Sequence, residues 1–341
     1  MMRFDFPWSL GRVMRACLGA SVLACAAHGA TAAPAVTLRM YSSLPADANS
    51  AHYVWFERFK ANLQTQYKGA IQVNYFPNAM LGKEADAIQQ VRLGAIDMMV
   101  SGTSIWSTLA PEVGVLDLGY LFEDWDQVGR SLDGKAGTLV SEFLMNKANV
   151  KPLGFGYSLG ARNVFTRKPV AGPTDLKNRK IRVLPVPNFI ATVKAMGATP
   201  IPMPLGEVYS GLQMGVIDGL EHDSATALAG KYYEVAKYGT LTKHVLNPIV
   251  ININKASFER IPAAMRDGFL QAAAEATAYE RKQAVAAEAK AIEDLKARGM
   301  TINETDRGYF RQAVKPVWDE FAKQYPTTAP ILQAIQAAES K

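Results

Sequence analysis

Two hydrophobic periods alternate in the first third of the chain, and this alternation limits the available folds more than any other feature. Residues 36–41, 71–75 and 96–100 show the period of two that is typical of strands. Between them, residues 53–63 and 84–93 carry apolar side chains at helical spacing. A β-α-β-α-β order predicts a parallel sheet with flanking helices, so we expect an α/β fold.

The rest of the chain continues this pattern as far as a long helical segment. Further strands are expected at 152–157, 180–183 and 249–254, and further helices at 125–149, 189–196 and 225–237. From about residue 262 to residue 298 the chain has no internal proline and is rich in alanine, lysine and glutamate. Pro262 suits a first helical turn and Gly299 suits a helix end. This segment predicts one very long helix, or two in line, that crosses domains.

The first 32 residues have the composition of an export signal. Arg3, Arg12 and Arg15 accompany a small apolar run at 16–27, which is shorter than the about 20 residues of a membrane helix. Ala30-Thr31-Ala32 has the small-x-small pattern of a cleavage site, so we predict cleavage after Ala32 and a location outside the cytoplasm. Lipidation at Cys25 is the less favoured alternative.

Cysteine and charge content exclude several classes of function. Both cysteines, Cys17 and Cys25, lie inside the predicted signal, so the mature chain is expected to have no disulfide and no thiolate chemistry. Cleavage would leave 309 residues, enough for two ordinary domains, and would lower the net charge from +6 to +4. No basic block is interleaved with aromatic residues, so we expect no nucleic-acid partner.

The strand Lys180-Ile181-Arg182-Val183 contains an arginine in an apolar setting. Ile181 and Val183 face one side, and Arg182 is followed by Leu184-Pro185-Val186-Pro187, which offers little to solvate it. A guanidinium in that position needs an anionic partner, and its planar fork suits a carboxylate. From residue type alone, an internal salt bridge is the competing interpretation.

Gly156-Tyr157-Ser158-Leu159-Gly160 matches the nucleophile elbow of α/β-hydrolases and follows a predicted strand. Asp218 and His244 follow in the order of a catalytic triad. The elbow should open a helix, however, and residues 161–166 alternate like another strand. An exported serine hydrolase that uses Ser158 therefore stays as the less favoured alternative.

Asp218-Gly219-Leu220-Glu221-His222-Asp223 gathers three carboxylates and an imidazole. Their spacing matches neither a zinc helix motif nor a calcium loop. We therefore expect no metal and no cofactor, and we assign these groups to helix capping or to ligand hydrogen bonds.

Three sets of segments, read in order, resemble the substrate-binding proteins of tripartite ATP-independent periplasmic (TRAP) transporters, the DctP-type family of the C4-dicarboxylate receptor. They are 76–84 with 90–97, 160–165 with 175–177 and 180–183, and 197–203 with 207–221. The resemblance implies two α/β lobes with a ligand cleft between them. Lobe I would comprise 33–159 and 248–287, and lobe II 160–247 and 288–341, with the long helix crossing both.

The resemblance also implies a function. It predicts a periplasmic receptor, not an enzyme, that binds a small organic acid and delivers it to TRAP permease membrane subunits. We expect a monomer. A receptor that serves a sensor kinase is the alternative that the chain does not separate from transport.

Site residues follow from the matching motif positions. Arg182 would form a bidentate bridge to the ligand carboxylate, and Arg162 would be a second anion contact. His222 stands where an asparagine is common, and it is a second cation if protonated. The predicted ligand-binding residues are Arg182, Arg162, His222, Glu221, Glu84, Tyr157, Leu205 and Tyr209.

Two departures from the family pattern bear on the ligand. Sialic-acid-type members have a carboxylate where this chain has Gly102, and an aromatic residue is replaced by Leu205. These changes favour a 2-oxo or 2-hydroxy monocarboxylate with an apolar tail over a polyhydroxylated sugar acid. A C4-dicarboxylate is the runner-up, because Arg162 would take its second carboxylate.

Overall fold

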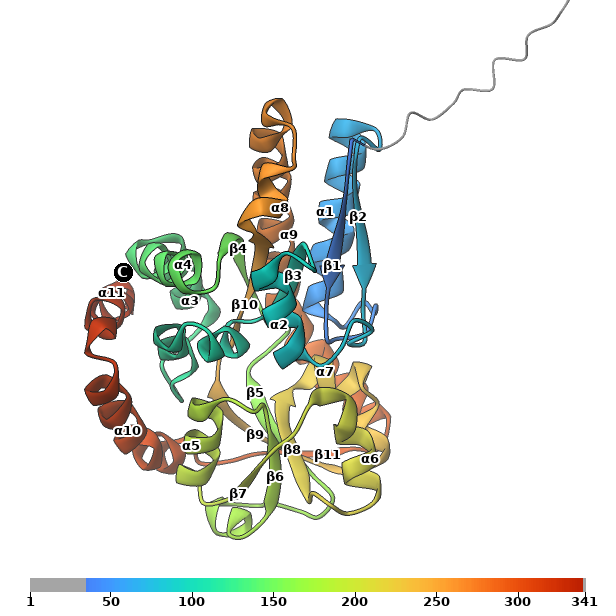
Figure 1. Cartoon of the computed structure of the whole chain (residues 1–341). Coiled ribbons are helices and arrows are strands. Elements are labelled where there is room, and N and C mark those ends of the chain that lie inside the picture. Colours follow the sequence, from blue (N-terminus) through green and yellow to red (C-terminus); the bar gives the residue numbers. More distant parts are fainter. Residues whose placement is uncertain (1–34, 340–341) are drawn as a thin grey trace, which may run out of the picture. The chain divides into compact units, whose positions relative to one another are not determined.

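The computed structural model describes residues 35–339, and these residues form two β-sheets flanked by helices (Figure 1). The strand order is β2-β1-β3-β10-β4 in the first sheet and β11-β9-β5-β8-β6-β7 in the second. The predicted α/β class is therefore confirmed. The predicted export signal, with its cleavage site at Ala32 and the alternative at Cys25, lies outside the described residues.

The first sheet is built as the alternation of periods predicted. Strand β1 runs parallel to β2 and β3, and β10 lies antiparallel between β3 and β4. All seven residues of β10 are buried, which fits a central strand covered on both faces. The strands are β1 (Val36–Tyr41), β2 (Ile71–Phe76), β3 (Met98–Gly102), β4 (Val150–Tyr157) and β10 (Pro248–Asn254).

The helices associated with the first sheet are α1 (Ala51–Tyr67), α2 (Glu84–Leu93), α3 (Trp125–Asp133), α4 (Lys135–Lys147) and α8 (Lys255–Glu259), with short 3₁₀ helices η1 (Thr103–Thr108) and η2 (Pro111–Asp117). The single helix expected at 125–149 was wrong. Gly134 has an extended backbone (φ −102°, ψ −150°) and separates α3 from α4. A residue in that conformation cannot continue a helix.

The second sheet mixes parallel and antiparallel pairs. Strand β6 pairs in parallel with β7 and β8, and β5 lies antiparallel between β8 and β9. Its strands are β5 (Arg162–Thr166), β6 (Lys180–Val183), β7 (Thr199–Pro202), β8 (Gly219–Asp223), β9 (Tyr238–Val245) and β11 (Thr301–Glu304). Its short helices are η3 (Pro173–Leu176), α5 (Pro187–Ala195), η4 (Leu205–Glu207), α6 (Val208–Gln213), α7 (Ser224–Ala229) and η5 (Tyr232–Glu234).

The chain passes between the sheets at residues 158–161 and 246–247 and along the long helix α9. All strands before residue 158, together with β10, belong to the first sheet, and the others belong to the second. The lobe boundaries stay a prediction. The last helices, α10 (Arg307–Gln324) and α11 (Ala329–Glu339), are joined through η6 (Pro326–Thr328), and α11 packs against α3 and α4 beside the first sheet.

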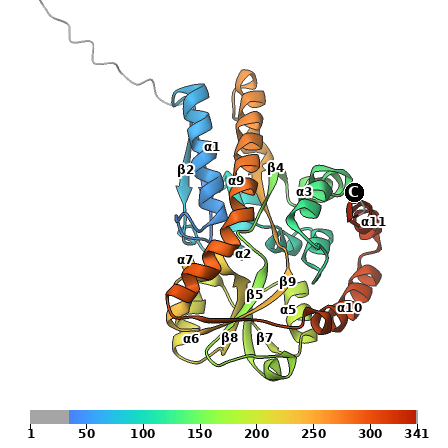
Figure 2. The ribbon, with the colours of Figure 1, turned by 180° about the vertical axis from the view of Figure 1, so that it is seen from behind.

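Helix α9 (Ala263–Ala297) is a single helix of 35 residues, as one of the two predicted arrangements required. It contacts α1, β4 and α7 along its length, so it reaches elements of both sheets (Figure 2). Glycines in β4 allow a close approach, because a Cβ on Gly154 would lie only 2.6 Å from Thr277 Oγ1. Thr277 Oγ1 also accepts a hydrogen bond of 2.9 Å from Trp55 Nε1 of α1.

Glu280 is a fully buried acid where α9 meets β4. Its Oε2 accepts a hydrogen bond of 3.0 Å from the backbone N–H of Tyr157, whereas Oε1 has no hydrogen-bond partner among residues 35–339. Burial raises the pKa of Glu280 from 4.5 to about 8, against the opposing effects of the Tyr157 hydrogen bond and the charge of Arg281.

We therefore predict that Glu280→Gln removes a loss of stability at alkaline pH. Because the folded-state pKa is raised, the native state favours protonated Glu280. This contribution is complete below about pH 4.5 and is lost as the pH rises through 8. Each unit of pKa difference corresponds to about 1.4 kcal/mol. The free energy of unfolding of the variant, measured by urea titration, should fall less between pH 5 and 9 than that of the wild-type protein.

The matched control is Glu275→Gln, an exposed position on the same helix. It should follow the wild-type pH dependence. If Glu280→Gln also follows it, burial of Glu280 does not cause the loss.

Candidate functional site

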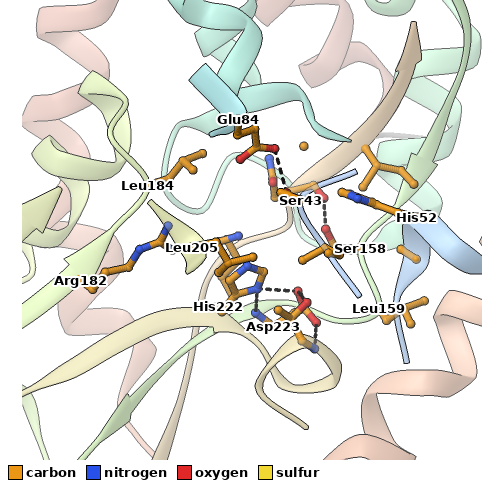
Figure 3. A pocket seen from close by; sticks show the side chains of 17 residues that line it. Ser43, His52, Glu84, Ser158, Leu159, Arg182, Leu184, Leu205, His222 and Asp223 are labelled. Carbon is orange, nitrogen blue, oxygen red and sulfur yellow. Dashed lines mark hydrogen bonds and ion pairs between the residues drawn. The ribbon is translucent and has the colours of Figure 1, made fainter. Parts of the chain in front are cut away.

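A polar cavity lies between the two sheets and is lined from both (Figure 3). Several of its residues stand at or just after the carboxyl ends of strands, which is where ligands bind in open α/β sheets. Examples are Ser43 after β1, Gly102 in β3 and Asp223 in β8. The lining residues are Ser43, Leu44, Ala51, His52, Glu84, Gly102, Ser158, Leu159, Arg162, Arg182, Leu184, Leu205, His222, Asp223, Thr226, Asn247 and Ile249.

The cavity has a wider neighbour of about 340 Å³. Both spaces are lined by Ser43, Glu84, Leu184 and Leu205, so they adjoin. The wider space is mainly apolar, and an exposed salt bridge of 2.8 Å joins two of its lining residues, Lys83 and Glu207.

Arg182 is the buried cation of this cavity that has no ion-pair partner among residues 35–339. Arg182 belongs to β6 and is only 1% exposed. Nε donates a hydrogen bond of 2.8 Å to the carbonyl oxygen of Met203, whereas the buried Nη2 has no partner in the described chain. Burial lowers the pKa of Arg182, yet an arginine stays protonated. The internal salt bridge, which was the competing interpretation from residue type alone, is not formed among residues 35–339.

Arg162 differs from Arg182, because a carboxylate already neutralises it. Its Nε donates to Glu221 Oε2 at 2.5 Å, and its Nη2 donates to Glu221 Oε1 at 2.8 Å. Both side chains of this bidentate pair are buried. His244 Nε2 lies 3.4 Å from Glu221 Oε2. Burial raises the pKa of Glu221, but the Arg162 charge and these hydrogen bonds outweigh it and hold that pKa at about 2. Glu221 therefore forms the ion pair with Arg162 but is not itself among the residues that line the cavity.

Two neutral imidazoles line the cavity. His222 Nδ1 lies 2.8 Å from Asp223 Oδ2, and burial together with the charge of Arg162 lowers the pKa of His222. His52 Nδ1 lies 2.8 Å from Ser42 Oγ, and burial lowers the pKa of His52 to about 3. Each ring therefore offers hydrogen bonding without a positive charge, so the second cation considered for His222 is not supplied at neutral pH.

Of the other predicted ligand-binding residues, Glu84 and Leu205 line the cavity, whereas Tyr157 and Tyr209 do not. Tyr157 stacks on Trp125 with a centroid separation of 4.8 Å, because this residue of β4 faces α3 and α9. Tyr209 donates a hydrogen bond of 2.5 Å to Glu234 at the surface. Both tyrosines therefore have other partners, and we leave them out of the proposed site.

Gly102 was interpreted as the loss of a polar group, and that interpretation was wrong. Asn247, from the connection between β9 and β10, fills the space in front of it. A Cβ on Gly102 would lie 2.7 Å from Asn247 Oδ1. The cavity thus regains a polar group from a segment 145 residues away. Sequence reasoning also missed Ser43, His52 and Thr226 as lining residues, because no motif or period marks them.

The triad considered for a hydrolase does not assemble among the described residues. Ser158 Oγ donates to the carbonyl oxygen of Asn247 at 2.6 Å. His244 Nδ1 lies 2.8 Å from Thr242 Oγ1, and Asp218 Oδ2 accepts from the backbone N–H of Lys180 at 2.9 Å. Ser158 leads into β5, not into a helix.

No helix within residues 35–339 has the length and apolar character needed to cross a membrane. The same residues contain no group of three or more His, Cys, Asp or Glu side chains arranged to hold a metal ion.

Removal of the two arginines should cost different amounts of stability in the protein without ligand. Arg162→Leu should lower the free energy of unfolding by about 3–5 kcal/mol, because Glu221 stays buried without its partner. Arg182→Leu should cost far less, because it removes a buried cation that has no carboxylate partner. Urea unfolding of the ligand-free variants measures both.

The double variant Arg162→Leu/Glu221→Leu is the control. It should recover part of the loss, since no uncompensated carboxylate remains. Equal losses for the two single variants would contradict this assignment of charges.

Comparison with known proteins gives consistent matches along the chain. The model of the family described as bacterial extracellular solute-binding protein, family 7, matches residues 42–324. The 2,3-diketo-L-gulonate-binding periplasmic protein YiaO of Escherichia coli K12 is 35% identical over 292 residues, which cover 85% of this chain and 88% of that protein.

Two solved structures have the same fold. A TRAP periplasmic solute-binding protein from Citrobacter koseri with bound D-glucuronate has a TM-score of 0.82 and 32% identity, and the match covers 88% of this chain and 99% of that one. Another, from Roseobacter denitrificans with bound L-galactonate, has a TM-score of 0.82 and 31% identity, with 89% and 99% covered.

Proposed function

The chain belongs to family 7 of the bacterial extracellular solute-binding proteins, the DctP family, and from this premise we propose that it is a TRAP receptor for a sugar acid. Members of this family are solute-binding proteins of transporters, not enzymes. They bind a small ligand and deliver it to membrane permease subunits. The observation that carries the proposal is the unpaired guanidinium of Arg182 in a cavity whose lining also supplies hydroxyl, imidazole and carboxamide groups.

A carboxylate is the ligand group that best satisfies Arg182. The guanidinium is desolvated, its Nη2 has no protein partner within the described residues, and its fork matches two carboxylate oxygens. Desolvation strengthens such charge-assisted bonds, since the local dielectric is low. Arg162 also lines the cavity but is already paired with Glu221, so we assign it a supporting role at the carboxylate.

The rest of the lining favours a ligand with several hydroxyl groups. Ser43, His52, Ser158, His222 and Asn247 all supply hydrogen-bonding atoms to the cavity. This composition supports a sugar acid in place of the short monocarboxylate with an apolar tail that the sequence favoured. The ligands named for YiaO and for the two solved structures are acids of this class.

A C4-dicarboxylate is less suited to this site. Its second carboxylate was expected to meet Arg162, but Glu221 occupies the fork of that arginine.

The remaining parts of the proposal concern location and partners. We propose export to the periplasm by the predicted signal, with cleavage after Ala32, and delivery to a TRAP permease. A monomer is expected, and a sensor kinase is the alternative recipient of the binding signal.

Replacement of Arg182 tests the anchor. Arg182→Ala should weaken sugar-acid binding by about 3–5 kcal/mol, because one partner of a buried charge pair is removed. Arg182→Lys should weaken it less, since lysine keeps the charge but loses the fork. Isothermal titration calorimetry measures both, with Lys177→Ala as an exposed control on the segment that leads into β6. Wild-type affinity in Arg182→Lys would rule out bidentate binding.

A thermal-shift screen tests the ligand class. D-glucuronate, D-galacturonate and L-galactonate should raise the melting temperature, and a ligand at 100 times its Kd stabilises by about 2.7 kcal/mol. Pyruvate, lactate and succinate should give smaller shifts. If only these short acids stabilise the protein, the sugar-acid assignment is wrong and the receptor assignment stands.

A further inference from the structure

Asn247 has more hydrogen-bond partners on one end of its carboxamide than on the other. Its Nδ2 lies 2.9 Å from Ser104 Oγ, 3.3 Å from Asp117 Oδ1 and 3.4 Å from Thr103 Oγ1. Among residues 35–339, no residue donates a hydrogen bond to Oδ1. The residue is buried, so each end of its carboxamide needs a partner or loses free energy.

The neighbours of Nδ2 determine which way the carboxamide is turned. Ser104 Oγ donates its proton to Asp117 Oδ1 at 2.7 Å, and Thr103 Oγ1 donates its proton to the carbonyl oxygen of Pro248 at 3.3 Å. Both hydroxyls therefore present only lone pairs to Asn247. A carboxamide oxygen in that place would meet lone pairs, so the NH₂ group is the end that lies there.

This orientation does not depend on the ionisation of Asp117. Burial raises the pKa of Asp117 to about 7, and its Oδ2 has no partner among the described residues. A proton on Oδ2 leaves Oδ1 free to accept from Ser104 and Asn247. The carboxamide therefore keeps the same orientation on both sides of neutral pH.

The opposite end of the carboxamide, Oδ1, reaches the cavity because Gly102 has no side chain. A Cβ on Gly102 would lie 2.7 Å from Oδ1, which is closer than real Cβ contacts allow. The backbone of Gly102 is ordinary (φ −55°, ψ 147°), so an alanine there would act on Asn247 and not through backbone strain.

We propose that Asn247 Oδ1 accepts a hydrogen bond from one hydroxyl group of the bound acid, and that Asp117 and Ser104 are positioning residues that hold the carboxamide in this orientation. The proposal rests on the sugar-acid function and adds the origin of its selectivity. Arg182 binds the carboxylate and would accept many acids, whereas Asn247 requires a donor at one carbon. An acid with hydrogen or a carbonyl oxygen at that carbon leaves Oδ1 buried and unpaired.

The test compares D-glucuronate with its 2-, 3- and 4-deoxy analogues by calorimetry. In the wild-type protein, one of the three analogues should bind more weakly than D-glucuronate. The difference in affinity should be at least about 10-fold beyond what the lost packing of one hydroxyl group causes. In Asn247→Leu, the affinity ratio between D-glucuronate and that analogue should fall to about 1, while the ratios for the other two analogues stay unchanged. A general disturbance of the cavity would weaken all four ligands alike and overturn the proposal.

Second variants keep the test valid if Asn247→Leu folds poorly. Gly102→Ala should reduce the same ratio by displacing Oδ1, and it should add no further loss in the Asn247→Leu background. Ser104→Ala should reduce that ratio in part, whereas Ser104→Thr, which keeps the hydroxyl, should restore it. Lys177→Ala, at an exposed position before β6, is the control and should leave every ratio unchanged.

Different results would contradict the sugar-acid assignment and the role of Asn247. If the wild-type protein binds no sugar acid, the proposed ligand class is wrong and the role of Asn247 is wrong with it. If sugar acids bind in an Arg182-dependent manner but Asn247→Leu leaves all ratios unchanged, the role of Asn247 alone is overturned.

Discussion

A buried cation without an internal counterion is the interaction on which the rest of this site depends. Arg182 and Arg162 are both buried, but only Arg162 has a carboxylate partner within the described residues. The protein therefore carries the desolvation cost of Arg182 in its ligand-free state. A bound carboxylate relieves that cost, so the energy gained on binding is partly a cost already present in the empty receptor. The two imidazoles of the cavity are neutral at neutral pH, so they add no positive charge to that of Arg182.

The parts that sequence predicted are those that depend on local pattern. Hydrophobic period identified the strands and helices of the first β-α-β-α-β segment, and alanine-rich composition identified α9. Arg182 was recognisable because its own strand and the prolines after it offer no solvation. The break at Gly134 was not recognisable, since a glycine inside a helical pattern is often tolerated and its backbone conformation depends on packing.

The parts that sequence missed depend on pairing between distant segments. Arg162 and Glu221 meet because β5 and β8 pair antiparallel with Val164 opposite Glu221, which brings both side chains to the same face. The residue pattern within either strand does not predict that register. The ligand that we propose differs from the one that the sequence favoured for the same reason. Gly102 lacks a side chain, and Asn247 fills its space from a distant connection, so the glycine adds a polar group to the cavity where the sequence indicated a loss.

Helix α9 has a mechanical consequence for a receptor whose ligand lies between two sheets. At 1.5 Å per residue its 35 residues extend about 52 Å, and it is in contact with α1, β4 and α7 along that length. A rotation of one sheet against the other must bend the helix or slide it over β4, where the side chains of Thr277 and Glu280 approach glycine positions closely. Closure by such a rotation would therefore strain the helix. Because that cost would be the same for every ligand, it would lower all affinities by the same factor and leave selectivity to the cavity.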